Sequence, residues 1–154
     1  MIFYYLDSSA WVKRYYYEVG TIWIQELFAN NQIAVCASIG LIEVIATLAR
    51  KCKSGAITLS ILEQKIRNIE NDWEHFIQID LTAEVIESAK KLAKELALRG
   101  ADAIHLASAL VTQRNFVEDN DQLIFVASDR ELKEASQKYG LIVIDPSEQV
   151  NKTI

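Results

Sequence analysis

Five short runs of apolar residues, separated by long stretches of helical sequence, constrain the fold of this chain most strongly. Within each run the hydrophobic residues follow one another without polar alternation, which is typical of strands covered on both faces. Such strands, when they alternate with helices, predict a parallel α/β sheet. The predicted strands are residues 2–6, 33–37, 76–79, 123–127 and 141–144.

Helical patterns fill the intervals between these runs. Residues 82–97 have the clearest amphipathic pattern, which Arg99-Gly100 is expected to end. Residues 103–111 are nearly all apolar, which predicts a buried helix. Further helices are predicted after residue 7 and over residues 21–29, 38–53 and 130–139.

The length of 154 residues suits one domain with one core, predicted to span residues 1–154. Hydrophobic residues make up 51% and charged residues 24%, which excludes a disordered chain. No apolar run approaches the roughly 18 residues of a membrane helix, and the first residues lack the basic region of a signal peptide. We therefore expect a soluble, cytoplasmic protein without a membrane partner, in which Cys36 and Cys52 are reduced core thiols.

The net charge of −5 is unevenly distributed. The first 60 residues carry five basic and four acidic side chains, so the acidic excess lies in the remainder. An acidic total argues against a protein that coats DNA by charge alone. It does not exclude an enzyme that holds a phosphodiester through a metal ion.

Four acidic residues occupy positions that a parallel sheet brings toward one edge. Asp7 directly follows the first predicted strand, Glu43 lies in the first turns of the helix after the second, and Asp129 follows the fourth after one serine. Parallel strands end at one edge of the sheet, where such folds bind ligands. We expect these three acids to converge there, and Asp102, which opens the buried helix, to join them if that helix packs beside the first strand.

Each of these acids also has a structural interpretation. Asp7 and Asp102 are candidate helix N-caps, Asp129 is a first-turn charge behind a capping box that begins at Ser128, and Glu43 is a solvated side chain. Together they favour a metal site, because clustered carboxylates raise one another's pKa unless a cation neutralises them. An oxygen-only donor set suits Mg²⁺ or Mn²⁺ rather than zinc.

Four segments carry these acids, in order along the chain. They are Tyr5-Leu6-Asp7-Ser8-Ser9-Ala10, Ile42-Glu43-Val44, Ala101-Asp102-Ala103-Ile104-His105-Leu106-Ala107 and Ala127-Ser128-Asp129-Arg130-Glu131-Leu132. Taken together, they resemble the PIN-domain ribonucleases, and among these the VapC-like toxins of bacterial and archaeal toxin–antitoxin pairs. The resemblance covers essentially the whole chain.

The resemblance implies a three-layer α/β/α sandwich with a parallel sheet, and a metal-dependent endoribonuclease. Asp7, Glu43, Asp102 and Asp129 match the acidic quartet that holds one or two Mg²⁺ or Mn²⁺ ions, which activate water for hydrolysis of an RNA phosphodiester bond. Ser8 or Ser9 matches a position that orients an acid or a water, and Ser8 is the predicted catalytic residue. The resemblance also implies a homodimer, and a cognate antitoxin protein whose tail enters the active-site groove.

Other residues have less specific interpretations. Arg14 and Arg50 are predicted to bind RNA phosphates, although charged helix faces are usually only solvated. His105, one turn after Asp102, is interpreted as a packed, hydrogen-bonded histidine rather than a ligand. The run Tyr15-Tyr16-Tyr17 is interpreted as packing or a partner contact rather than base stacking, and Asp145-Pro146 as a turn.

Other functions remain open. A haloacid-dehalogenase-type phosphatase needs an acid two residues after Asp7, where this chain has Ser9. A receiver domain needs an acidic pair and a late lysine that are not evident. A PIN-like module that only binds RNA or protein normally loses one or more of the four acids, all of which are present here. A housekeeping RNA-processing nuclease has the same chemistry as a toxin and is not distinguished from it.

Overall fold

The computed structural model of the protein describes residues 1–149. Its strands form a single parallel sheet in the order β3-β2-β1-β4-β5. Each strand lies within two residues of its predicted bounds. The strands are β1 (Ile2–Leu6), β2 (Ile33–Ala37), β3 (Ile77–Ile79), β4 (Gln122–Val126) and β5 (Ile142–Ile144).

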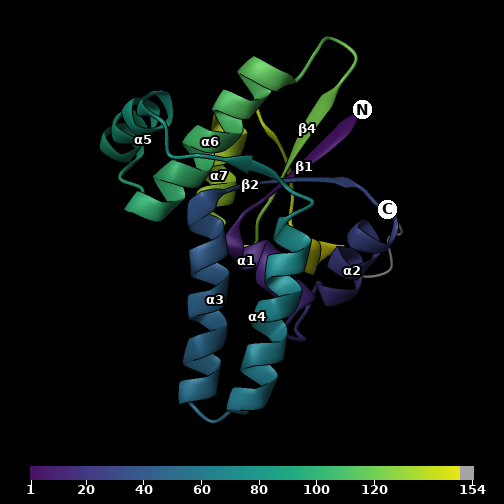
Figure 1. Cartoon of the computed structure of the whole chain (residues 1–154). Coiled ribbons are helices and arrows are strands. Elements are labelled where there is room, and N and C mark those ends of the chain that lie inside the picture. Colours follow the sequence, from purple (N-terminus) through teal and green to yellow (C-terminus); the bar gives the residue numbers. More distant parts are fainter. Residues whose placement is uncertain (150–154) are drawn as a thin grey trace.

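Helices cover both faces of the sheet, which confirms the predicted three-layer α/β/α sandwich (Figure 1). One face carries α5 (Ala83–Leu96), α6 (Gly100–Phe116) and α7 (Arg130–Lys138). The other face carries α1 (Ser8–Trp11), α2 (Thr21–Ala29), α3 (Ser38–Lys53) and α4 (Leu59–Trp73). Among the described residues, no helix has the length and apolarity needed to cross a bilayer.

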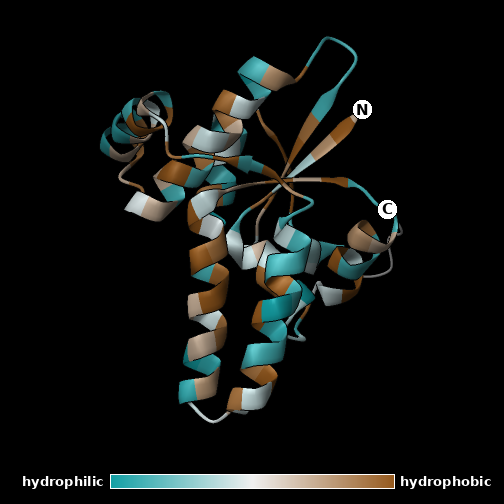
Figure 2. Cartoon of the chain, viewed as in Figure 1, coloured by the Kyte–Doolittle hydropathy of each residue, from teal (hydrophilic) through white to brown (hydrophobic). Residues whose placement is uncertain are grey.

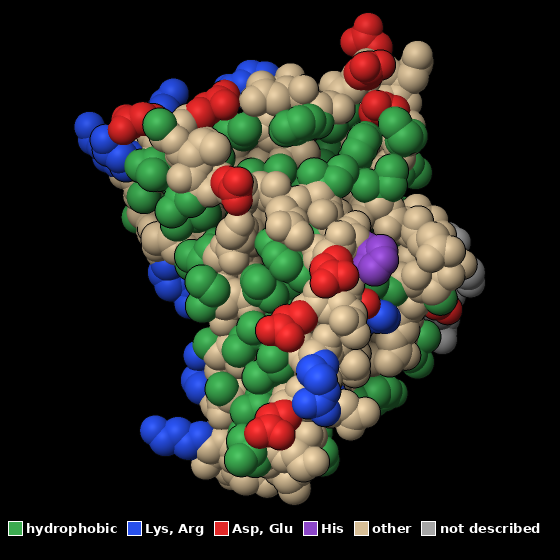
Figure 3. Space-filling view, in the orientation of Figure 1, with side chains coloured by type: hydrophobic (Ala, Val, Ile, Leu, Met, Phe, Trp, Pro, Cys, Tyr) green, Lys and Arg blue, Asp and Glu red, His purple; other side chains and the backbone are tan. Residues whose placement is uncertain are grey.

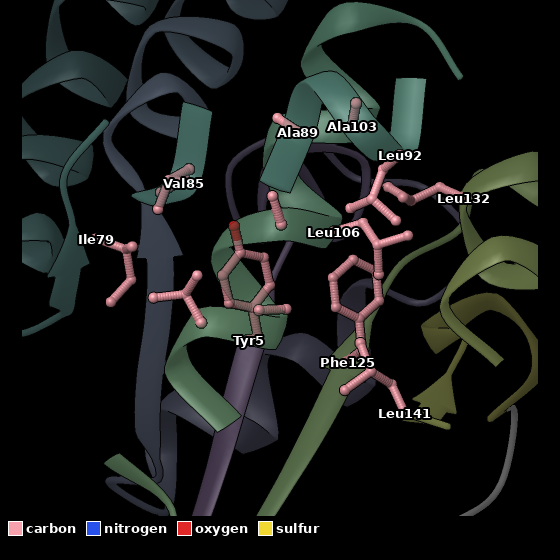
Figure 4. Packing of buried hydrophobic residues seen from close by; sticks show 14 of the residues in the cluster. Tyr5, Ile79, Val85, Ala89, Leu92, Ala103, Leu106, Phe125, Leu132 and Leu141 are labelled. Atoms are coloured by element: carbon pink, nitrogen blue, oxygen red, sulfur yellow. The ribbon is translucent and has the colours of Figure 1, made fainter. Parts of the chain in front are cut away.

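The alternation of side chains along the central strand divides the core into two clusters. Tyr5 faces the α5–α6–α7 layer and stacks on Phe125 of β4, with ring centroids 5.2 Å apart (Figure 4). Tyr4 and Leu6 face the other layer. Because both faces of the sheet are covered, the strands are mostly hydrophobic, with the exposed Gln78 of β3 and Gln122 of β4 as exceptions (Figure 2).

Aromatic rings join the α3–α4 hairpin to the sheet. Trp11 is fully buried and packs on Trp73 and Phe76, with centroid distances of 5.7 and 4.7 Å. In Figure 1, α3 and α4 run side by side and project beyond the sheet. Trp11, the last residue of α1, therefore connects α1 to the end of α4.

The structure corrects three predicted helix ends. α5 ends at Leu96, with Ala97 in the left-handed conformation (φ 52°), and Gly100 begins α6 instead of ending α5. Asp102 is consequently the third residue of α6 and not its N-cap. Asp129 is the N-cap of α7 in place of Ser128, because its Oδ1 accepts the Leu132 amide at 3.0 Å.

Candidate active site

Asp7 lies at the carboxyl end of the central strand and is held by several donors. Its Oδ1 accepts the backbone N–H of Ala10 at 2.9 Å, so it caps α1. The Ser9 hydroxyl lies 2.8 Å from both carboxylate oxygens. Ser9 Oγ also accepts the Ser128 amide at 2.9 Å, which connects the ends of β1 and β4. The structural and functional interpretations of Asp7 are therefore compatible.

The serine that contacts the Asp7 carboxylate is Ser9 and not Ser8. The side-chain hydroxyl that reaches Asp7 belongs to Ser9, and the hydrogen bonds of the described residues include none from the Ser8 hydroxyl to that carboxylate. Asp7 is the N-cap of α1, and Ser9 is the second residue of that helix, where its hydroxyl is within reach of the carboxylate. Of the two serines considered for orienting an acid, Ser9 makes this contact, and a catalytic role of Ser8 stays a prediction.

The Asp7 carboxyl is unusually costly to ionise. Its burial, at 3% exposure, raises its pKa to about 6 from an ordinary 3.8. The charge of Glu43 acts in the same direction, while His105 and the donors described above lower the pKa. Burial and a neighbouring carboxylate thus outweigh these hydrogen bonds, and a cation beside Asp7 would relieve both effects.

Glu43 is half-buried on α3 and is bound by a histidine. Its Oε1 lies 2.5 Å from Nε2 of His105, so the interpretation of Glu43 as a solvated side chain is wrong. His105 is 1% exposed, and its Nδ1 lies 3.1 Å from the Tyr5 hydroxyl. The prediction of a packed, hydrogen-bonded histidine is confirmed, and its partner is one of the four acids.

Asp102 and Asp129 share a cation that sequence reasoning missed. Arg99 donates from Nε to Asp102 Oδ2 at 3.0 Å and from Nη2 to Asp129 Oδ2 at 3.2 Å. Burial raises the pKa of Asp102, Arg99 lowers it, and the charge of Asp129 raises it again. Arg99 precedes α6 in a stretch that was interpreted only as a helix break, and no motif marks an exposed arginine in such a place.

The four acids therefore form two pairs. Among residues 1–149, no three Asp, Glu, His or Cys side chains stand close enough to share a metal ion as they are placed. Charges nevertheless act within each pair, of Glu43 on Asp7 and of Asp129 on Asp102. The chemistry of the donors fits a hard divalent cation, because all four are carboxylates. Asp7 and Asp102 are buried with raised pKa values, and a guanidinium already bridges Asp102 and Asp129.

We expect Arg99→Gln to tighten Mn²⁺ binding by roughly two- to tenfold, because an ion must compete with Arg99 for Asp102 and Asp129, and exposed ion pairs are individually weak. Titration of the metal-free protein with Mn²⁺ measures this change. Arg114→Gln is the matched control, since Arg114 pairs with Glu84 in another exposed contact. Unchanged affinity in Arg99→Gln would show that Arg99 and the ion do not share these carboxylates.

Asp145, a further acid at the end of a strand, has structural partners. It caps the turn Pro146–Glu148, as predicted, and accepts hydrogen bonds from Ser128, Ser147 and Lys133. Burial alone raises its pKa, but these donors prevail, so the pKa lies below its ordinary value. Asp145 thus differs from Asp7, whose pKa is raised at the same edge of the sheet.

Asp145→Asn is expected to destabilise the protein by about 1–2 kcal/mol at neutral pH, because it removes a charged hydrogen bond from a buried network. The lowered pKa of Asp145 stabilises the fold above its ordinary value of 3.8, and this contribution disappears as the pH falls through the folded pKa. Urea unfolding at pH 7.5 and 3.5 measures the difference between wild type and variant. An equal difference at both pH values would contradict the assignment.

The two arginines predicted to bind RNA occupy different surroundings. Arg14 pairs with Asp72, with Nε to Oδ2 at 2.5 Å, and its guanidinium lies 4.0 Å from the centre of the Phe28 ring. Arg50 is exposed on α3 and donates to Thr47 at 2.9 Å. On the face shown in Figure 3, Lys and Arg side chains lie among acidic and hydrophobic ones. RNA binding by Arg14 and Arg50 stays a prediction.

The three adjacent tyrosines have unequal environments. Tyr15 is buried and donates to Asp72, whereas Tyr17 is 78% exposed. Tyr16 is half-buried beneath the Lys51 ammonium, which lies 4.3 Å from its ring centre. The packing interpretation is confirmed for Tyr15.

Comparison with known proteins connects this geometry to a family. The PIN domain model matches residues 4–139. The chain is 38% identical over 110 residues to ribonuclease VapC45 of Mycobacterium tuberculosis, covering 69% of this chain and 74% of that protein. PAE2754 from Pyrobaculum aerophilum has a similar crystal structure, with a TM-score of 0.65, 18% identity, and coverage of 96% of this chain and 85% of that one.

A second solved structure has the same fold. VapBC2 from Rickettsia felis, crystallised with a DNA fragment from its promoter, gives a TM-score of 0.63 at 18% identity and covers 94% of this chain and 98% of that one. The region matched by the family model contains all four acids. It also contains Arg99, Ser9 and His105.

Proposed function

This chain belongs to the PIN-domain family, and from that premise we propose that it is a divalent-metal-dependent endoribonuclease, the toxin of a toxin–antitoxin pair. One observation carries the proposal. Asp7 is a buried carboxyl with a pKa raised to about 6, beside the charge of a second acid, at the sheet edge where folds of this type bind ligands. A nearby divalent cation would remove that unfavourable burial of charge.

Asp7, Glu43, Asp102 and Asp129 are the residues that would hold the ion. When bound, Mg²⁺ or Mn²⁺ supplies Lewis-acid polarisation of the phosphodiester and favours ionisation of water at the site. The other contributions come from side chains of the protein. Ser9 orients the Asp7 carboxylate, and it connects the strand ends that carry Asp7 and Asp129.

Arg99 has a distinct part in this proposal. Its side chain is 71% exposed, so it is free to move from the two acids to a phosphate oxygen when RNA and metal arrive. A guanidinium matches a phosphate with two parallel hydrogen bonds. Arg99 thus protects the acids from mutual repulsion in the metal-free protein and is available to bind substrate in the complex.

The proposed partners follow from the similarity of this protein to VapC and VapBC proteins. RNA is the proposed substrate because the relative VapC45 is named a ribonuclease. A cognate antitoxin protein is the proposed inhibitor, supported by the resemblance of the chain to VapC toxins and by the VapBC assemblies among its structural neighbours. A homodimer is the proposed assembly.

Cleavage of a mixed RNA substrate by the purified protein tests this function. We expect cutting with Mg²⁺ or Mn²⁺, none with EDTA, and none by Asp102→Asn with either ion. Single-stranded DNA of matched length is the substrate control. A folded, metal-loaded protein that binds RNA without cutting it would instead support a PIN-like binding module.

A further inference from the structure

A buried polar chain runs from the core to Glu43. It begins at the Tyr5 hydroxyl, passes 3.1 Å to Nδ1 of His105, and continues 2.5 Å from Nε2 to Oε1 of Glu43. Tyr5 and His105 are almost completely shielded from water, at 0% and 1% exposure. Because a buried ring nitrogen without a partner is unfavourable, both nitrogens of His105 are engaged by protein groups.

The hydrogen-bond chemistry gives the chain a direction. A carboxylate oxygen only accepts, so the short contact with Glu43 requires the proton on Nε2 of His105. In the neutral ring Nδ1 is then the acceptor, and the Tyr5 hydroxyl is its donor. Each group in the chain thereby determines the orientation of the next one.

Packing holds both rings in place. The Tyr5 ring is stacked against Phe125 with an interplanar angle of 8°, and in Figure 4 its hydroxyl points toward α6, the helix that carries His105. On the other side, Gly40 of α3 comes close to His105. A Cβ at position 40 would lie 3.2 Å from His105 Cε1 and 2.4 Å from Cys36 Sγ. The absence of a side chain at Gly40 therefore leaves room for Cys36 and allows the His105 ring to lie close against α3.

We infer that His105 is a positioning residue, which donates Nε2–H to Glu43 Oε1 and holds the carboxylate at the edge of the sheet, with its own orientation fixed by Tyr5. Among the hydrogen bonds of the described residues, Glu43 has no other side-chain partner, so Oε2 is left for a ligand. This inference rests on the proposed function, because it gives Glu43 its orientation for the same ion. A partner that orients a metal ligand typically changes metal affinity or activity by about 10–100-fold when it is removed.

The first test observes the hydrogen bonds between Tyr5, His105 and Glu43 directly in the metal-free wild type. The protein has two histidines, and His75→Gln removes the other signal. Long-range ¹H–¹⁵N correlation at pH 7.5 is expected to show the proton on Nε2 of His105, and Tyr5→Phe is expected to shift the Nδ1 resonance. A ring protonated on Nδ1 alone would overturn the inference.

The second test separates positioning from packing. His105→Gln retains an amide donor near Nε2, and His105→Leu retains similar volume without a donor. We expect His105→Leu to weaken Mn²⁺ binding or cleavage by about 10–100-fold and His105→Gln to recover most of the loss. In Tyr5→Phe/His105→Leu, the melting temperature should return toward that of wild type, because the orphaned hydroxyl is removed, while Mn²⁺ affinity stays low.

The outcomes distinguish this inference from the proposed function. Mn²⁺ binding that is weakened by His105→Leu and restored by His105→Gln supports positioning even if wild type cuts no RNA. Wild-type Mn²⁺ affinity and cleavage in a folded His105→Leu variant would overturn it while leaving the nuclease proposal intact. If His105→Leu does not fold, the folded His105→Gln variant provides the test. A loss of Mn²⁺ binding in His105→Gln as large as the loss in Asp102→Asn would contradict the role of the donor.

Discussion

Asp7→Asn is expected to abolish RNA cleavage and to make the metal-free protein more stable at neutral pH. Because Asp7 is a proposed direct metal ligand, its removal should lower cleavage by more than about 100-fold, since loss of an outer partner alone reduces activity by about 10–100-fold. Asparagine is as good an N-cap as aspartate and retains an oxygen for the Ala10 amide, so the fold of α1 is preserved. The variant therefore removes charge without removing the cap.

The stability gain has a defined pH dependence. Between the ordinary value of 3.8 and the folded pKa of about 6, the folded protein binds more protons than the unfolded chain, so wild-type stability falls as the pH rises. The unfavourable contribution is complete above pH 6 and absent well below pH 4. The shift corresponds to a gain of about 1–3 kcal/mol for Asp7→Asn at pH 7.5, at 1.36 kcal/mol for each pKa unit.

Urea unfolding of metal-free wild type and Asp7→Asn at pH 7.5 and 4 measures this effect. The gain should be present at pH 7.5 and be largely lost at pH 4. Asp145→Asn is the matched control, since it should lose stability at neutral pH and, once folded, keep cleavage. Destabilisation of Asp7→Asn at both pH values would show that the carboxylate serves only the structure.

Trp11→Ala is expected to destabilise the protein by about 3–5 kcal/mol, a large part of the total stability of a domain of this size. The side chain is fully buried, contacts the rings of Trp73 and Phe76, and donates to the Tyr15 hydroxyl at 3.1 Å. Its removal leaves a cavity at the base of the α3–α4 hairpin and loosens the helix that carries Glu43. The free energy of unfolding in urea measures the effect.

Tyr17→Ala is the control for Trp11→Ala. Tyr17 lies in the same segment but is 78% exposed, so its removal should change the free energy of unfolding by no more than about 0.5 kcal/mol. A small effect of Trp11→Ala, similar to that of Tyr17→Ala, would contradict the packing described for the hairpin.

The strands and the parallel α/β sheet were predictable from the sequence pattern, because strands that are buried on both faces lack polar alternation, whereas the three-layer arrangement was implied by the resemblance. A strand such as β2, covered by α3 on one side and by α6 on the other, has no polar alternation, and helices between such strands lead to a parallel sheet. The edge occupied by Asp7 follows from this topology without any knowledge of the side-chain contacts.

The contacts within the site were less predictable, because they depend on the reach of single atoms. Whether Ser8 or Ser9 meets the Asp7 carboxylate is decided by the pitch of one helical turn. The partner of His105 depends on how closely α3 and α6 approach, and Gly40 permits that approach. Arg99 bridges two acids that are 27 residues apart in sequence, a relationship that appears only in three dimensions.

Mn²⁺ titration of the purified protein, followed in parallel by electron paramagnetic resonance and by cleavage of RNA, shows whether the four acids hold the ion that cleavage requires. We expect binding and cleavage to rise over the same metal concentrations in wild type, to be lost together in Asp102→Asn, and to persist in folded Asp145→Asn. Cleavage in EDTA, or cleavage by an Asp102→Asn variant that no longer binds Mn²⁺, would show that the reaction does not depend on this site.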